Sequence, residues 1–163
     1  MYTYNKYASK ILVHRYRIQE VEQSIGAIIK YQNNVQDNIA TSYPHEFLLL
    51  KNRRGFWGFP QGHKEKGENE LQTLIREVTE ETGIRRLDIR SYIGKIHYSY
   101  FRADGMKYEK EVSFYYATTH TKTVNISYEH DEFRWTPFSD ALLMLHHGQL
   151  KSIMMKGHKK GLY

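Results

Sequence analysis

The 163-residue sequence predicts one domain of the α/β or α+β sandwich class. Two apolar runs of strand length, residues 25–31 and 47–50, precede an amphipathic helical segment at 69–82. Two longer runs, 89–101 and 108–118, are rich in aromatic and β-branched residues and read as strands. Several strands combined with one long helix indicate a sheet that is covered by helices.

The predicted strands of the first half are separated by polar or glycine-containing segments. Gly26 lies inside the first run, where a missing side chain indicates close approach of another segment. The polar stretch 32–42 is expected to be a loop, and Arg53-Arg54-Gly55 turns the chain out of the second run.

The helix predicted at 69–82 has a core face and a C-terminal cap. Gly83 follows it, where a residue of left-handed conformation commonly ends a helix. The spacing i, i+3, i+4, i+7 of a buried face is found at Leu71, Leu74, Ile75 and Val78.

The second half is predicted to contain a hairpin, a strand and a last helix. The Asp-Gly pair at 104–105 is a strong hairpin signal between the two long runs. After a strand near 133–135, Thr136 is expected to cap a helix that has Pro137 at its first position and runs to about His147. The Lys-, His- and Gly-rich residues that follow are expected to be loosely held.

Composition excludes several classes of function. The absence of cysteine excludes a disulfide framework, a thiolate zinc site and a cysteine nucleophile. No apolar run approaches the length of a membrane span or an export signal, so a cytoplasmic protein without a membrane partner is expected. The net charge of +6 favours polyanionic partners such as nucleotides or RNA.

An acidic cluster interrupts this basic chain. Glu77, Glu80 and Glu81 share one helix face at i, i+3 and i+4, where like charges repel by about 0.2–0.5 kcal/mol per pair. They also lie near the C-terminal end of the helix, where the macrodipole disfavours anions by a further ~0.3–1 kcal/mol each. A bound divalent cation removes both penalties, because carboxylate oxygens are ligands that Mg²⁺ and Mn²⁺ prefer.

These carboxylates belong to a longer motif that resembles the Nudix box at every defined position. The matching residues are Gly62-x5-Glu68-x7-Arg76-Glu77-Val78-x-Glu80-Glu81-x-Gly83-Ile84. The resemblance implies a Nudix α/β/α sandwich with a mixed sheet and a catalytic loop–helix–loop. It also implies metal-dependent hydrolysis of a pyrophosphate bond in a nucleotide-like substrate. We therefore expect a single Nudix domain over residues 1–163, with an N-terminal extension at 1–20 and the box at 62–84.

The resemblance also implies roles for the motif residues. Glu80 and Glu81 would be metal ligands, and Glu77 would be a ligand or would orient and deprotonate the attacking water. The carbonyl oxygen of Gly62 would complete the shell around one to three ions, Mg²⁺ or alternatively Mn²⁺. An ion pair that holds the loop against the helix is implied for Glu68 and Arg76.

Over residues 25–145 the sequence is most similar to the asymmetrical diadenosine tetraphosphate hydrolases, which implies ATP and AMP as products. In that subfamily the glutamate similar in position to Glu129 adds a carboxylate to the metal site, and the lysine similar to Lys110 contacts the phosphate chain. Glu129 could instead be a loop charge, and Lys110 could extend from an apolar strand face. Further candidates for substrate contacts are Gln61, His63, Tyr98, Tyr100, His130 and Phe133, although strand aromatics are more often core residues and a lone histidine is more often structural.

Two departures keep other substrates open. Phe56 and Gln61 replace a histidine and a lysine of the animal enzymes, and the stretch 57–62 resembles plant relatives and bacterial RNA 5′-pyrophosphohydrolases. RNA with a 5′-triphosphate is therefore the main alternative, followed by another nucleotide pyrophosphatase. A binding module without catalysis is disfavoured because no residue of the box is missing. A phosphoinositide polyphosphatase is disfavoured because the ending at Trp135 favours the dinucleotide. The basic, tyrosine-rich residues 1–20 could bind RNA, form a surface helix or contact a second copy, so a monomer and a homodimer both stay open.

Overall fold

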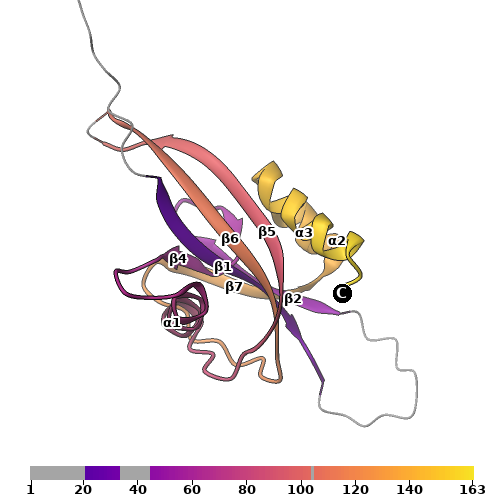
Figure 1. Ribbon diagram of the computed structural model, residues 1–163. Coiled ribbons are helices and arrows are strands. Elements are labelled where there is room, and N and C mark those ends of the chain that lie inside the picture. Colours follow the sequence, from indigo (N-terminus) through magenta and orange to yellow (C-terminus); the bar gives the residue numbers. More distant parts are fainter. Residues whose placement is uncertain (1–20, 34–44, 104) are drawn as a thin grey trace, which may run out of the picture.

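The computed structural model describes residues 21–33, 45–103 and 105–163. The predicted extension at 1–20 and most of the predicted loop at 32–42 lie outside these residues. The described chain forms a mixed β-sheet with helices on both faces, which confirms the predicted α+β sandwich (Figure 1). None of the helices in this part of the chain combines the length and apolar character needed to cross a bilayer.

The sheet has the strand order β3-β2-β1-β6-β5, with β4 paired to β1 and β7 paired to β2. β1 and β6 run parallel, whereas the other pairs are antiparallel. The predicted hairpin is confirmed as β5 and β6, which pair along almost their full lengths. The strands are β1 (Glu22–Tyr31), β2 (Glu46–Asn52), β3 (Trp57–Gly58), β4 (Gln61–His63), β5 (Asp88–Phe101), β6 (Lys107–Thr119) and β7 (His130–Pro137).

Close packing in the middle of the sheet explains the glycine in β1. A Cβ atom built on Gly26 would lie 2.5 Å from the ring of Phe114 and 3.1 Å from Cβ of Gln61. The close approach predicted for Gly26 is therefore confirmed. It allows the short strand β4, which carries the start of the glutamate-rich motif, to pair with β1.

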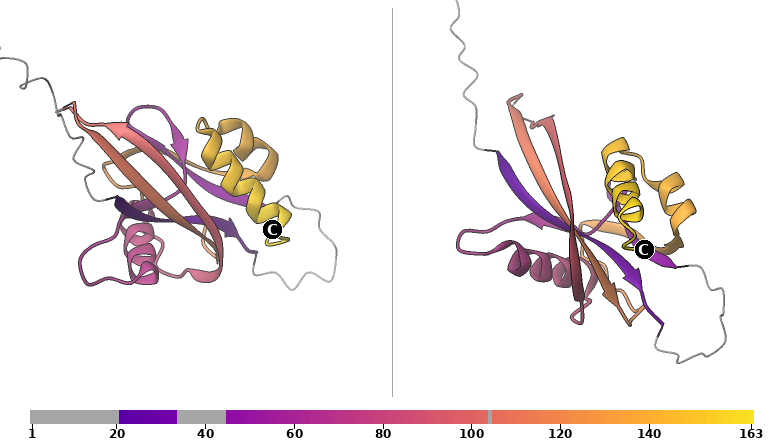
Figure 2. Two further views of the ribbon diagram at one scale, coloured as in Figure 1. Left: turned by 45° about the horizontal axis from the view of Figure 1, so that its top comes forward. Right: turned by 45° about the vertical axis from the view of Figure 1, so that its right-hand side comes forward.

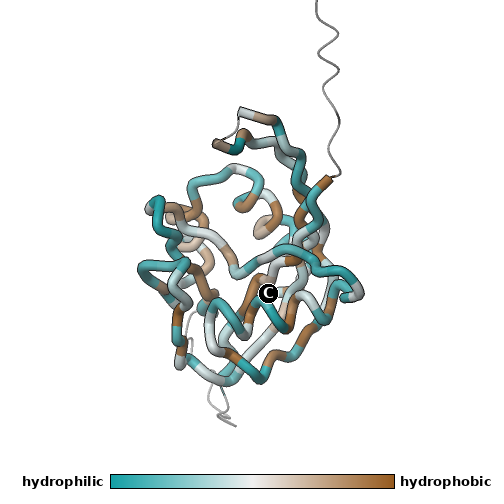
Figure 3. The backbone as a smooth tube through the Cα atoms, turned by 90° about the vertical axis from the view of Figure 1, so that its left-hand side faces the viewer, coloured by the Kyte–Doolittle hydropathy of each residue, from teal (hydrophilic) through white to brown (hydrophobic). Residues whose placement is uncertain are grey.

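Helices cover the two faces of the sheet and create two cores (Figure 2). α1 (Glu70–Thr82) packs on one face, where Leu74 and Val78 join apolar residues of β1 and β2. α2 (Phe138–Met144) and α3 (Gly148–Lys159) pack on the other face. Brown and teal stretches alternate along the helices and strands in Figure 3, as expected of elements with one buried and one exposed side.

The C-terminal cap of α1 is as predicted, but only Leu74 and Val78 of its four predicted core residues are buried. Asn69 and Gln72 form a reciprocal capping box, and Gly83 has a left-handed φ of 72°. Leu71 and Ile75, predicted as core residues, are 44% and 48% exposed. The helix is rotated so that its inward face includes two carboxylates; the buried residues are Thr73, Leu74, Glu77, Val78, Glu81 and Thr82.

The C-terminal part differs most from the sequence prediction. Thr136 lies within β7, and α2 begins after Pro137 without a side-chain cap and ends at Met144 rather than near His147. The residues expected to be loosely held form α3, because an apolar face is buried against the sheet. That face consists of Leu150, Ile153, Met154 and Gly157.

Candidate active site

The loop before α1 brings Gly62 directly against Glu77. A Cβ atom built on Gly62 would lie 1.9 Å from Cδ of Glu77, so only glycine leaves room for this carboxylate. Glu77 is 9% exposed, and burial raises its pKa against the opposing effect of Arg76. The sequence motif therefore places a desolvated carboxylate on the backbone of β4.

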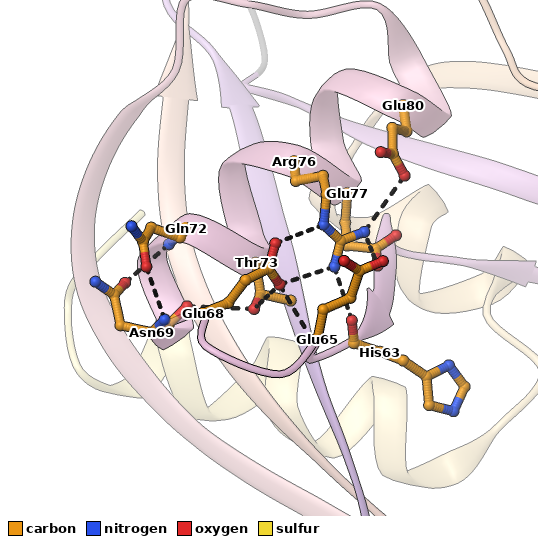
Figure 4. A network of polar contacts seen from close by, with 9 residues as sticks. All are labelled: His63, Glu65, Glu68, Asn69, Gln72, Thr73, Arg76, Glu77 and Glu80. Atoms are coloured by element: carbon orange, nitrogen blue, oxygen red, sulfur yellow. Dashed lines mark hydrogen bonds and ion pairs between the residues drawn. The ribbon is translucent and has the colours of Figure 1, made fainter.

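Arg76 joins the loop to the helix (Figure 4). Its Nε and Nη2 donate to the two oxygens of Glu68 at 2.7 and 2.9 Å, and Nη2 also donates to the carbonyl oxygen of His63 at 2.8 Å. Nη1 donates to Glu77 at 2.7 Å and to Glu80 at 3.3 Å. The expected Glu68–Arg76 ion pair is thus present, and hydrogen bonds from Arg76 and Thr73 lower the pKa of Glu68 to about 2.

Glu81 is the most strongly perturbed carboxyl group of the site. It is 7% exposed, and its Oε2 accepts a hydrogen bond from the backbone N–H of Gln61 at 2.9 Å. Burial raises the pKa of Glu81 to about 8; the charges of Glu77 and Glu129 add to this, and Lys110 opposes it. His130 Nε2 lies 3.8 Å from Glu81 Oε1.

Glu81 opens into a cavity of about 720 Å³, within the size range of small-molecule sites. Five predicted substrate contacts also line it: Gln61, Tyr98, Tyr100, Lys110 and His130. The cavity crosses the sheet, because its walls come from β3 at one end of the strand order and from β5 at the other.

Lys110 is the cation beside these carboxylates. Burial lowers its pKa, and the charges of Glu22, Glu77 and Glu81 oppose this. The Tyr98 hydroxyl is hydrogen-bonded to Gln61, and burial raises its pKa. Lys110 is paired with Tyr98 across β5 and β6. Acidic, basic and aromatic groups therefore share one side of the cavity.

Of the predicted glutamates of the motif only Glu81 lines the cavity, and Glu80, Glu129, His63 and Phe133 lie outside its lining as well. The side chain of Glu80 is 60% exposed and binds Arg76, and Glu129 is exposed in the loop before β7, although its charge reaches Glu81. His63 instead pairs with Glu22 at 3.1 Å. Phe133 packs against the core on the α1 side, a placement that favours a structural role over adenine stacking.

The opposite wall of the cavity was missed by the sequence predictions. Phe56 is 39% exposed there and lies 5.5 Å from the ring of His147. Gln149 donates to the carbonyl oxygen of His97 at 2.9 Å and so fixes the start of α3 against β5. The spacing of Leu150, Ile153 and Met154 was the signal that could have revealed α3 and this wall.

The donor chemistry fits a divalent cation. Glu77 and Glu81 are buried carboxylates with raised pKa values, so nearby positive charge would stabilise their ionised forms. As the side chains lie, no three acidic or histidine groups of the described residues converge on one point, because Arg76 binds both Glu77 and Glu80. A cation at Glu77 and Glu81 would therefore compete with Arg76 for Glu80.

Comparisons with known proteins identify relatives of this arrangement. A family model for the NUDIX domain matches residues 38–156. The asymmetrical bis(5′-nucleosyl)-tetraphosphatase of Sus scrofa is 31% identical over 123 residues, which cover 70% of this chain and 79% of the relative. An RNA pyrophosphohydrolase of Campylobacter jejuni is 31% identical over 120 residues, which cover 63% of this chain and 75% of the relative.

A solved structure extends the likeness to three dimensions. The crystal structure of a Caenorhabditis elegans Ap4A hydrolase in a binary complex matches with a TM-score of 0.69 and 27% identity. The match covers 87% of this chain and 98% of that chain.

Proposed function

This chain belongs to the Nudix family, and we propose that it hydrolyses diadenosine tetraphosphate asymmetrically to ATP and AMP. It is a Nudix pyrophosphohydrolase, an enzyme that cleaves a pyrophosphate bond in a nucleotide substrate. The proposal concerns which nucleotide it cleaves and where.

One observation carries the proposal: Glu81 and Lys110 line a single cavity that has aromatic side chains on both sides. Tyr98 and Tyr100 lie on the β5 side, and Phe56 and His147 lie on the β3 and α3 side. A phosphate chain between two bases has this distribution of charge and aromatic surface, because each base offers a face for stacking. The similarity to the Sus scrofa and Caenorhabditis elegans enzymes supports the same substrate.

Each residue has a distinct task in this reaction. Lys110 binds the phosphate chain, and Gln61 and His130 donate hydrogen bonds to it. Glu77 orients the attacking water and accepts its proton, and Arg76 holds Glu77 in place. Clamping one adenine fixes one phosphorus atom against that water, so cleavage is asymmetric.

Glu77, Glu80, Glu81 and Glu129, with the carbonyl oxygen of Gly62, would hold divalent cations, Mg²⁺ or alternatively Mn²⁺. The cations would neutralise phosphate charge and lower the pKa of the attacking water. Magnesium is the first choice because the side-chain donors are all carboxylate oxygens.

RNA with a 5′-triphosphate is a second candidate. The Campylobacter jejuni RNA pyrophosphohydrolase is as identical to this chain as the tetraphosphatase, over a slightly shorter alignment. Gln61 also stands where animal tetraphosphatases have a phosphate-contacting lysine, and a weaker hold on the phosphate chain favours a shorter one.

The test is a substrate panel that contains diadenosine tetraphosphate, diadenosine triphosphate, nucleoside triphosphates and 5′-triphosphorylated RNA. We expect diadenosine tetraphosphate to have the highest kcat/KM and to give ATP and AMP. In ¹⁸O-labelled water the label should appear in AMP. Formation of two ADP, or a kcat/KM at least about tenfold higher for the RNA, would replace the dinucleotide with the second candidate.

A single variant tests the phosphate contact. Lys110→Ala should raise KM and lower kcat/KM, since a charge-assisted contact of roughly 1.5–3 kcal/mol is lost. Lys95→Ala is the matched control, because Lys95 is an exposed lysine on the neighbouring strand that pairs with Glu111. Equal effects of the two substitutions would remove Lys110 from the substrate site.

A further inference from the structure

The solvent-facing side of α3 carries several basic residues and no acidic one. The helix contains Lys151, Lys156, His158 and Lys159 and no acidic residue, and Lys160 follows at its C-cap. Within the described part of the chain, none of its three lysines forms an ion pair. This face therefore keeps its positive charge.

The lysines border a hollow of about 490 Å³ whose lining has no carboxylate. Lys160 Nζ donates to the carbonyl oxygen of Ile93 in β5 at 3.0 Å. Lys156 lies against the next residue of β5, because a Cβ atom built on Gly94 would be 2.5 Å from Lys156 Nζ. The strand therefore holds two ammonium groups beside the helix. The lining residues are Lys151, Ser152, Met155, Lys156, Lys159 and Lys160.

This hollow continues the wall of the active-site cavity. The residues 148–150 line the cavity, and Lys151 is the next residue and the first of the hollow. The helix of twelve residues is about 18 Å long, roughly the length of five nucleotides in a stacked strand at ~3.4 Å each. A phosphodiester chain that leaves the cavity can therefore meet positive charge along the whole helix.

Two simpler explanations account for less of the pattern. Lysines near a helix C-terminus complement the macrodipole, which explains Lys156 and Lys159 but not Lys151 in the first turns. A membrane surface is also disfavoured, because the apolar side chains of α3, such as Leu150 and Ile153, are buried in the core and are not available for insertion.

We propose that this basic face (Lys151, Lys156, Lys159 and Lys160) binds the backbone of a single-stranded RNA whose 5′ end occupies the active-site cavity. The inference rests on the proposed function only in requiring that the cavity accepts a nucleotide. It adds a site outside the Nudix motif and makes RNA a binding partner whether or not RNA is the preferred substrate.

The test measures binding without turnover. Fluorescence anisotropy is recorded with 3′-labelled oligouridylates that have a 5′-hydroxyl end, a dinucleotide and an oligomer of about eight nucleotides. We expect the longer oligomer to bind the wild type at least ~10-fold more tightly. In Lys156→Glu/Lys159→Glu this gain should disappear, and the slope of log K against log salt should fall in magnitude by about 1.4, because two phosphate contacts are lost.

The matched control is Arg85→Glu/Arg86→Glu, which makes the same charge change in the exposed segment between α1 and β5. It should change affinity for the longer oligomer by less than ~3-fold. Equal weakening by both double substitutions would assign RNA binding to overall charge and overturn the proposal, as would the absence of any length dependence. If Lys156→Glu/Lys159→Glu loses binding to phosphatidylserine vesicles but binds RNA as the wild type does, the face would be assigned to a membrane instead.

Hydrolysis separates this inference from the proposed function. Both double variants should cleave diadenosine tetraphosphate at the wild-type rate, because the dinucleotide does not extend along α3. If the wild type does not cleave it, but Lys156→Glu/Lys159→Glu still loses RNA binding, the proposed substrate fails and the RNA-binding face stands.

Discussion

At the residue scale, the position of the Glu77 carboxylate depends on the missing side chain of Gly62. The two residues are in contact although they belong to different elements, β4 and α1. Arg76 holds Glu77 from the other side by a 2.7 Å hydrogen bond. The carboxylate is therefore fixed before substrate arrives, as catalysis that depends on preorganised charge requires.

Gly62→Ala should consequently lower kcat by roughly 10²-fold, because displacing a reacting group by about 1 Å costs that much. The fold should persist, since Glu77 can turn toward Arg76. The measurement is steady-state kinetics of Gly62→Ala, Glu77→Gln and the double variant. Glu77→Gln should lower kcat by ~10³ or more, and the double variant should be no slower than Glu77→Gln alone. If the loss of kcat in the double variant equals the product of the losses in the two single variants, Gly62 acts independently of Glu77.

Glu129 is a separate prediction at this scale. It is exposed, but its charge contributes to the raised pKa of Glu81. Glu129→Gln should lower activity by ~10- to 10³-fold and raise the Mg²⁺ concentration needed for half-maximal rate, as loss of an outer ligand does. Glu132→Gln, an exposed carboxylate on β7 that pairs with Lys51 and Arg134, serves as the control. Identical Mg²⁺ curves for both variants would make Glu129 a loop charge.

At the scale of elements, α1 and α3 show what the sequence could and could not predict. The C-terminal cap of α1 at Gly83 was predicted from the sequence, whereas the capping box of Asn69 and Gln72 was not, although it depends on local chemistry alone. The rotation of α1 could not be predicted, because Leu71 and Ile75 satisfy the same apolar spacing as Leu74 and Val78. Only the sheet decides which face is buried, and here it favours the face that brings Glu81 to the cavity and Glu77 against Gly62.

The interpretation of α3 failed for a different reason. Its charged residues and glycines mask the apolar spacing that begins at Leu150, and its stability comes from tertiary packing rather than helix propensity. Tyr163 completes that packing: its ring lies 4.8 Å from that of Phe47, and its hydroxyl donates to Met154 O at 2.8 Å. The cavity wall at His147 could not be predicted without this helix.

Gly157→Ala tests the packing of α3. A Cβ atom at this position would lie 2.2 Å from the Tyr163 hydroxyl, so the ring must move. We expect a net loss of about 1–2 kcal/mol, the cost of overpacking less the gain in helix propensity, or a Tm lower by roughly 2–8 °C. Tyr163→Phe should cost about 1 kcal/mol in the wild type and almost nothing in Gly157→Ala. Additive losses in a denaturation series would contradict the contact.

At the scale of the whole molecule, the cavity is lined by residues that are far apart in the sequence and belong to different elements. Glu81 comes from α1, Lys110 from β6, and His147 from the approach to α3. Motif spacing could predict Glu81, and family resemblance could predict Lys110. No local signal in the sequence connects His147 with them, because only the strand order brings these residues together. This assembly buries carboxylates at a cost in stability, and that cost can be measured through pH.

Metal-free protein should become less stable as pH rises from about 6.5 to 8. The pKa of Glu81 is raised from 4.5 to about 8, so in this range the folded state retains a proton that the unfolded state has released. Because the folded state binds more protons, the free energy of unfolding falls with pH, by at most ~1.4 kcal/mol per unit for one group. The lowered pKa of His130 acts in the opposite sense, but chiefly below pH 6.5. Urea denaturation of the wild type and of Glu81→Gln isolates the effect of this group. As pH rises, the free energy of unfolding should fall more in the wild type than in the variant. Mg²⁺ at 100 times its Kd should add about 2.7 kcal/mol to the free energy of unfolding of the wild type only. Parallel pH curves for the two proteins would show that Glu81 is not the group that titrates. Equal stabilisation of both by Mg²⁺ would show that Glu81 does not bind the cation.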